Sequence, residues 1–294
     1  SILSALSSKV NYASSPRLWN PTPEEYQRVS KKELQLFGHS KFSADRIIFA
    51  LAGDIDKDSA ITLLKKHFAD WKTVNQKKTA PSLSFLHKPG IYATEKELTQ
   101  ANISMSQPFV KRPHPDYYPA SVASFILGGG SFSSRLTAKV RSEEGLAYSI
   151  YSRTGSDYND TALTTIALQT KAESSALAIK LIFEEVKKLA EQGPTEEELD
   201  LAKKTLIESL PGLFDSPSST ATIFAADELV GKSQDHYIDY VKKINAITTE
   251  QVKAMIAKYF SPEKMTISIV GPVIAWKGLE NVTVIPLTEL DFRK

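Results

Sequence analysis

The pattern of apolar and polar positions repeats between two segments of the chain. Ser30 to Gly53 aligns without a gap with Thr248 to Gly271, 218 residues further on. Each segment opens on a hydroxyl residue followed three positions later by Glu33 or Gln251, which is the capping-box signature of a helix start. Each continues with an amphipathic helical pattern, a Phe-Ser pair and an alternating apolar run that ends in glycine. This shared order predicts a duplicated helix–strand unit.

The alternating runs of the two copies have their apolar positions in register. Only three of the 24 aligned pairs are identical, so the prediction depends on the order of cap, helix, turn, strand and glycine. Alternation of this kind predicts strands with one buried face. The matching positions are Ile47, Phe49 and Leu51 in the first copy and Met265, Ile267 and Ile269 in the second.

Only the second copy is preceded by a full set of elements. Residues 146–153 and 161–170 alternate with period two and are rich in β-forming residues, which predicts two strands. A helical face follows at Ile179, Ile182, Val186 and Leu189, and Thr195 with Glu198 caps the next helix. Only 29 residues precede the first copy. We therefore expect an α+β chain of duplicated sheet-with-flanking-helices units, of which the first is incomplete.

A polar stretch divides the two predicted units. Lys72 to Pro89 carries a Lys pair together with prolines and serines, a composition typical of a linker. The predicted organisation is residues 1–71 as the C-terminal part of a first domain, 72–89 as the linker and 90–294 as a complete second domain.

Composition excludes several classes of function. The chain has 36 basic and 34 acidic residues, a net charge of +2, so it lacks the basic character of a nucleic-acid-binding protein. It contains no cysteine, which excludes thiolate metal sites, iron–sulfur clusters and a cysteine nucleophile. No apolar run approaches the ~20 residues of a membrane span, so we expect no transmembrane segment.

The histidine spacing argues against a zinc site in this chain. No two histidines stand four apart, and neither H-E-x-x-H nor H-x-x-E-H occurs. The glycine run at 128–130 lacks the spacing of a phosphate-binding loop and favours a sharp turn or a close backbone approach. The five histidines are His39, His67, His87, His114 and His236.

The stretch from Gly128 to Ser152 is the strongest candidate for chemistry. Leu136 and Val140 predict the buried face of a helix that carries Arg141 near its end, and a glycine stops the helix before a strand with Tyr148. A helix that reverses into a strand would bring Arg141 and Tyr148 together. A guanidinium beside a phenol is a donor pair suited to an oxyanion or a peptide carbonyl.

The run Arg-Ser-Glu-Glu-Gly-Leu-Ala-Tyr, residues 141–148, resembles the second-domain signature of pitrilysin/insulinase-type zinc peptidases. These inverzincins include mitochondrial processing peptidase and insulin-degrading enzyme. Residues 46–54 resemble the last strand of the family's first domain, and residues 67–71 resemble the close of its following helix. The resemblance covers nearly the whole chain and implies the fold of mitochondrial processing peptidase.

The resemblance also implies two homologous domains that close around an unfolded peptide and contribute different residues to the site. In such proteins the first domain binds zinc through H-x-x-E-H and a downstream Glu. The second carries the Arg/Tyr pair, which contacts substrate and helps to stabilise the tetrahedral intermediate. Only this second contribution carries over, to Arg141 and Tyr148 as catalytic residues. Zinc is then expected on a half upstream of Ser1 or on a partner subunit, with none in this chain.

Two functions follow as hypotheses. The first is the substrate-binding portion of a zinc metalloendopeptidase that cleaves unfolded or extended peptides, inactive as this chain alone. The alternative is a non-catalytic scaffold or interaction subunit, of the kind that the family contributes to respiratory complexes. Expected partners are an extended peptide and a zinc-bearing half or subunit. A fragment, a heterodimer subunit and a silent homologue all remain open, and a bacterial periplasmic or cytoplasmic location is compatible with the resemblance.

Overall fold

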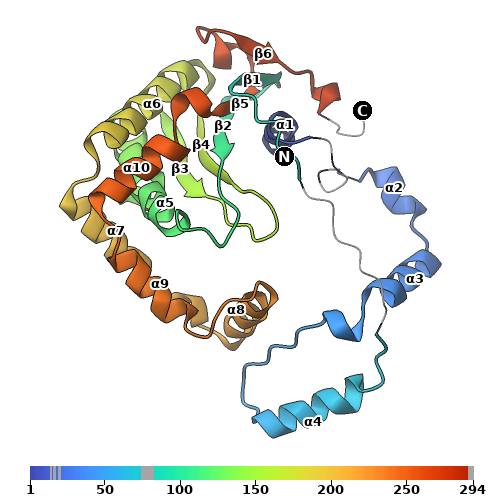
Figure 1. Ribbon diagram of the computed structural model, residues 1–294. Coiled ribbons are helices and arrows are strands. Elements are labelled where there is room, and N and C mark those ends of the chain that lie inside the picture. Colours follow the sequence, from blue (N-terminus) through green and yellow to red (C-terminus); the bar gives the residue numbers. More distant parts are fainter. Residues whose placement is uncertain (14, 16–17, 19–20, 74–82, 291–294) are drawn as a thin grey trace. The chain divides into compact units, whose positions relative to one another are not determined.

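The computed structural model describes residues 1–13, 15, 18, 21–73 and 83–290 (Figure 1). The chain divides into two compact units. The first contains Ser1–Trp19, Pro81–Leu206 and Val241–Lys294, and the second contains Asn20–Ala80 and Ile207–Tyr240.

The predicted domain limits are not tested by this division. Half of the predicted linker, residues 74–82 of 72–89, lies outside the described residues. The limits 1–71, 72–89 and 90–294 therefore stay a prediction.

A mixed sheet forms the centre of the first unit. Six strands are paired among the described residues, in the order β3-β4-β2-β5-β1-β6. β5 lies between β1, to which it is parallel, and β2, to which it is antiparallel. The α+β prediction and the two strands expected near residues 146–153 and 161–170 are confirmed. The bounds are β1 Gly90–Glu95, β2 Gln100–Pro108, β3 Ala147–Thr154, β4 Leu163–Lys171, β5 Thr266–Gly271 and β6 Val282–Val284.

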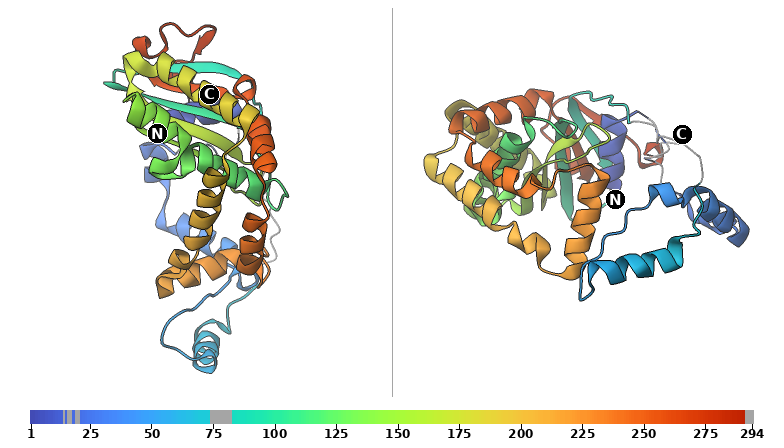
Figure 2. Two further views of the ribbon diagram at one scale, coloured as in Figure 1. Left: turned by 90° about the vertical axis from the view of Figure 1, so that its left-hand side faces the viewer. Right: turned by 60° about the horizontal axis from the view of Figure 1, so that its bottom comes forward.

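Helices cover the apolar face of this sheet. Helices α5, α6 and α10 lie on one side of the sheet (Figures 1 and 2). Ile103, Ile166 and Ile267 of the sheet are buried, and Ile267 lies with residues of α6 and α10. The apolar positions that predicted the α6 face, Ile179, Ile182, Val186 and Leu189, are all buried. The bounds are α5 Tyr117–Ser124, α6 Ser175–Gln192 and α10 Thr249–Tyr259, and α7 Glu196–Glu208 begins in this unit and ends in the second.

The opposite face of the sheet is polar and is partly covered by α1 (Ile2–Asn11). Asn11 is fully buried there; its Nδ2 donates to Ser106 Oγ at 3.0 Å, and Thr266 Oγ1 donates to its Oδ1 at 2.9 Å. Leu6 and Val10 add an apolar contact with Val270 of β5. Helix α1 therefore belongs to the compact unit of the second repeat copy.

The second unit contains the first repeat copy and the largely helical segment Ile207–Tyr240. Both capping boxes are present, at Ser30–Glu33 and Thr248–Gln251, so the prediction of two capped helices is confirmed. The helices are α2 Pro23–Arg28, α3 Lys31–Lys41, α4 Lys57–Phe68 and α8 Pro217–Leu229, and α9 His236–Asn245 begins here and ends in the first unit. Across the described ranges, no helix has the length and apolarity that a membrane crossing requires.

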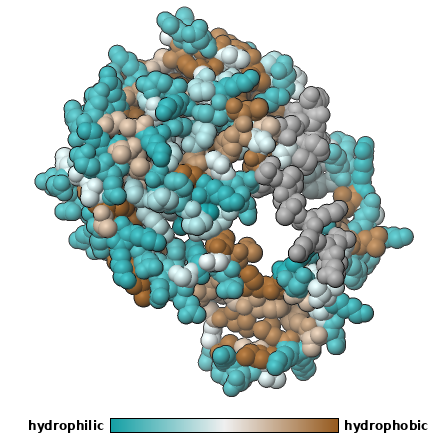
Figure 3. Space-filling view, in the orientation of Figure 1, coloured by the Kyte–Doolittle hydropathy of each residue, from teal (hydrophilic) through white to brown (hydrophobic). Residues whose placement is uncertain are grey.

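The strand predicted at the end of the first repeat copy does not form, so this prediction is wrong. Residues 47–52 are extended but pair with no described strand, because the sheet that would flank them is not present beside them. Their apolar side chains stay exposed, whereas the matching strand β5 is buried throughout. Figure 3 shows hydrophobic residues at the surface of the lower part of the molecule, where Figure 1 places α4.

Candidate functional site

The segment that carries Arg141 is a helix with an unusually wide turn. Residues Thr137–Glu143 are π-helical, a geometry that occurs mostly as short pieces at functional sites. Leu136 and Val140 are fully buried, as predicted, and Arg141 is exposed beside them. Gly145, at a φ of +64°, ends the helix, and Leu146 N donates to Val140 O at 2.9 Å.

The glycine run lets an adjoining helical turn lie against β3. A Cβ on Gly128 would stand 2.5 Å from the backbone N of Ser152, closer than any real Cβ contact. Ser152 Oγ donates to the carbonyl of Ser124 at 2.7 Å, which joins strand and helix at the same place. The glycine is therefore required by close backbone approach, as the sequence predicted.

Tyr148 occupies a β-bulge at the start of β3. Ala147 pairs with Thr170 and Ser149 with Gln169, so Tyr148 is the extra residue of its strand. Simple alternation would place Tyr148 on the face of Ile150, which is buried. The bulge instead leaves the tyrosine 74% exposed. The sequence predicted the strand and the residue but not the bulge that frees its phenol.

Arg141 lies over an aromatic ring that the sequence did not single out. Its guanidinium carbon is 5.0 Å from the ring centroid of Phe132, within cation–π range. Phe132 is itself exposed, and Ser131 before it has a positive φ of 52°. The available signal was a lone large apolar residue in a run of glycines and serines.

Arg141 and Tyr148 have no protein hydrogen-bond partner in the described part of the chain, and no contact there joins one to the other. Both are exposed, one at the end of the π-helical turn and the other at the start of β3. Their joint action on a ligand stays a prediction.

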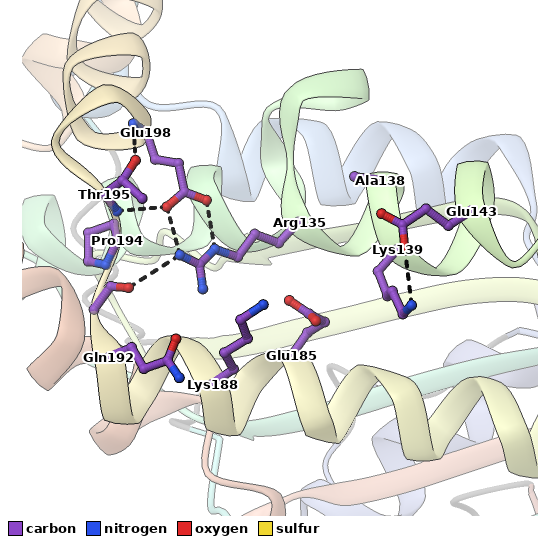
Figure 4. Close-up of a pocket in the computed structure, with 11 residues that line it drawn as sticks. Arg135, Ala138, Lys139, Glu143, Glu185, Lys188, Gln192, Pro194, Thr195 and Glu198 are labelled. Carbon is purple, nitrogen blue, oxygen red and sulfur yellow. Dashed lines mark hydrogen bonds and ion pairs between the residues drawn. The ribbon is translucent and has the colours of Figure 1, made fainter.

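A partly buried ion pair fixes the start of the same helical segment. Arg135 donates from Nε and Nη2 to the two carboxylate oxygens of Glu198, at 2.7 Å each, and also to the carbonyl of Gly193 (Figure 4). The two side chains are only 14% and 27% exposed. The Glu198 carboxylate also accepts the backbone N–H of Thr195, so this pair ties the Arg141 helix to the start of α7.

Glu198 has a depressed pKa. Burial acts to raise the pKa of its carboxyl, but the hydrogen bonds from Arg135 and Thr195, with the charges of Arg135 and Lys188, outweigh burial. The folded pKa therefore lies below the ordinary value of about 4.3. Since it is depressed, the pair's contribution to stability is present above the unfolded pKa and is lost as pH falls through the folded pKa.

Glu198→Gln should lower the free energy of unfolding by about 2 kcal/mol at neutral pH, because it leaves a buried guanidinium without its counter-charge. Urea unfolding at pH 7 measures this change. On acidification below about pH 4 the variant should lose less stability than the parent chain, since it lacks the carboxyl that titrates.

Glu184→Gln is the matched control, because Glu184 forms an exposed pair with Lys180 at 3.8 Å on α6. Such pairs contribute ~0–1 kcal/mol. Equal unfolding free energies for the Glu198 and Glu184 variants would contradict a structural role for the buried pair.

Metal-ligating residues are dispersed wherever the structure is described. No group of three His, Asp or Glu residues in that part of the chain is arranged to hold a metal ion. The described donor set therefore does not fit the zinc implied by the resemblance.

Comparison with known proteins identifies the fold and its family. A family model described as the peptidase M16 inactive domain matches residues 28–206, which include the Arg141 helix, the Tyr148 bulge and the Arg135–Glu198 pair. The chain belongs to the peptidase M16 inactive-domain family. The predicted resemblance to pitrilysin/insulinase-type peptidases is confirmed.

Individual relatives of this M16 domain carry two kinds of name. A Bacillus subtilis protein called uncharacterized zinc protease YmxG is 28% identical over 255 residues, which are 85% of this chain and 60% of that protein. A Helicobacter pylori protein called non-peptidase homolog YmxG is 31% identical over 192 residues, 65% of this chain and 44% of that protein. The chain thus spans about half the length of these relatives.

The fold is also shared with a solved structure of the family. The crystal structure of a peptidase M16 inactive domain from Pseudomonas fluorescens superposes with a TM-score of 0.80 at 25% identity. The match covers 93% of this chain and 66% of that one. The α+β architecture is therefore that of the M16 inactive domain.

Proposed function

We propose that this chain is the substrate-binding portion of a zinc metalloendopeptidase that acts on unfolded or extended peptides. The observation that carries the proposal is the bulge at Tyr148, which exposes its phenol, together with the exposed Arg141 guanidinium seven residues earlier in the sequence signature of the family. Neither donor is used by the described part of the protein itself. Both are available to a peptide carbonyl that gains negative charge during hydrolysis.

The position of β3 supports binding of an extended peptide. β3 is the edge strand of the sheet as described, and the exposed residues Tyr148, Tyr151 and Arg153 all lie on it. An extended peptide binds a sheet edge through main-chain hydrogen bonds, with side-chain pockets that give specificity. The peptide would then lie along the strand that begins at Tyr148.

The first repeat copy supports a zinc-bearing half or subunit as the partner. Leu34 on α3 is 60% exposed, whereas Val252 at the matching position of α10 is fully buried. The extended run 47–52 lacks the flanking strands that β5 has in β1 and β2. We propose that the zinc-bearing half supplies this sheet and covers these apolar side chains.

Reconstitution tests the proposal. The chain and its zinc-bearing half, or the complete protein, should cleave a quenched fluorescent peptide that neither part cleaves alone, and the chain alone should bind the uncleaved peptide. An assembled, zinc-loaded protein in which the chain binds no peptide would overturn the proposed role.

The second candidate is a non-catalytic scaffold or interaction subunit. The relative named non-peptidase homolog in Helicobacter pylori favours it. Its signature in the same experiment is a stable assembly that contains no zinc and has no cleavage activity.

A further inference from the structure

A cavity of about 610 Å³ lies between α1 and the polar face of the sheet. Its floor comes from β2, β3 and β4, and one wall comes from the serine-bearing side of α1. The side chains that carry the inference are Ser104, Tyr151, Arg153 and Thr165 on the strands and Ser4 and Ser8 on α1. This cavity is separate from the pocket that surrounds Arg135 and Glu198.

Ten of the fifteen described residues that line the cavity carry a hydroxyl group, and Arg153 has the one charged side chain among them. Arg153 is exposed and forms no ion pair or hydrogen bond within the described residues. Ser104 is only 8% exposed, and its Oγ likewise has no partner in that part of the chain. Its Oγ is not among the fully buried atoms without a partner, so it is open to the cavity, where a ligand can take the place of water as its hydrogen-bond partner.

We propose that this cavity is a subsite for a peptide carboxylate, bound by the Arg153 guanidinium and by hydroxyl donors such as that of Ser104. The inference rests on the proposed function, since it assumes that the chain binds extended peptides. It adds a preference for an acidic group at a defined place in the peptide.

The charge distribution favours a carboxylate over other ligands. A guanidinium binds the two oxygens of a carboxylate through parallel hydrogen bonds. No acidic side chain is among the described residues that line the cavity. Asp157 and Asp160 interact electrostatically with Tyr12 at the rim, but both already accept backbone N–H groups, from Asn159 and Leu83 respectively.

The geometry of β3 sets the distance between Tyr148 and the proposed carboxylate subsite at Arg153. Arg153 follows Tyr148 by five residues on β3, and an extended strand rises ~3.3 Å per residue, which gives a separation of roughly 17 Å. A peptide running along β3 would therefore place its carboxylate about five residues from the carbonyl that Tyr148 contacts.

Fluorescence anisotropy with four labelled probes tests the subsite. The probes share one extended sequence, carry either Glu or Gln at the predicted distance, and have either a free or an amidated C-terminus. The chain should bind one carboxylate form about tenfold more tightly than its amide, an advantage that high salt reduces. Which pair of probes shows the difference distinguishes an acidic side chain from a terminal carboxylate.

Arg153→Gln should abolish the preference for the carboxylate probe over its amide, by weakening binding of the carboxylate probe alone. Arg153→Glu should reverse the charge preference, so that a further probe with Lys in place of Glu binds more tightly than the Glu probe. Lys180→Gln is the control, since it removes the same charge from an exposed position on α6. If the probes bind but Arg153→Gln keeps the preference for the acidic one, or the parent chain shows none, the subsite is wrong. If no probe binds the parent chain, the proposed peptide-binding function fails.

Discussion

In the proposed assembly of this chain with a zinc-bearing half, Arg141→Ala should lower kcat/KM about a hundredfold while zinc content and unfolding free energy stay unchanged. The guanidinium is exposed, contacts only the Phe132 ring among the described residues and supports no core packing. Its loss therefore removes a donor without disturbing the fold. Tyr148→Phe should act in the same direction, because it deletes only a hydroxyl from a side chain that the bulge already holds in solvent.

Cleavage of a quenched peptide, metal analysis and urea unfolding measure the three quantities together. Lys187→Ala provides the control, since Lys187 is an exposed cation on α6 whose i,i+4 partner is Glu191 at 3.8 Å. Unchanged turnover in both the Arg141 and the Tyr148 variant would refute their assignment as catalytic residues.

Gly128→Ala should destabilise the chain by about 3 kcal/mol or more. The added Cβ would meet the backbone N of Ser152 at 2.5 Å, and backbone cannot move aside as a flexible side chain can. The helical turn or β3 would have to shift, and the bulge that presents Tyr148 would shift with it. The midpoint of urea unfolding measures the loss.

Gly212→Ala is the matched substitution, because no atom lies within 4 Å of the Cβ it would add and its φ is not in the left-handed region. It should leave stability unchanged or slightly raised. Equal unfolding midpoints for the Gly128 and Gly212 variants would show that the close approach at Ser152 does not constrain the fold.

The architecture was predictable where local signals agreed with tertiary packing. The capping boxes, the apolar face of α6 and the alternation in β3 and β4 each specify an element that the sheet then buries. The run at Ile47 to Leu51 has an equally clear alternation and forms no strand in the described structure. Strand pairing is non-local, so a period-two pattern predicts a strand only where a partner strand lies beside it.

The site was predictable in residue type but not in geometry. Arg141 and Tyr148 were identified from a signature, yet the bulge at Tyr148 depends on register with β4, which no local pattern encodes. Arg135 and Glu198 are 63 residues apart, and their pairing follows only from the packing of two helices. Phe132 had a weak signal, because an isolated aromatic in a glycine-serine run has no periodicity to interpret.

Because of the bulge at Tyr148, the candidate site residues are different from the residues that stabilise the fold. Tyr148 projects from the sheet and Arg141 from its helix, while Ile150 and Val140 beside them are buried. Under the proposed function, substitutions at these two exposed positions would remove the chemistry and leave folding intact. The relatives' names, a zinc protease in one bacterium and a non-peptidase homolog in another, are compatible with a scaffold of this kind.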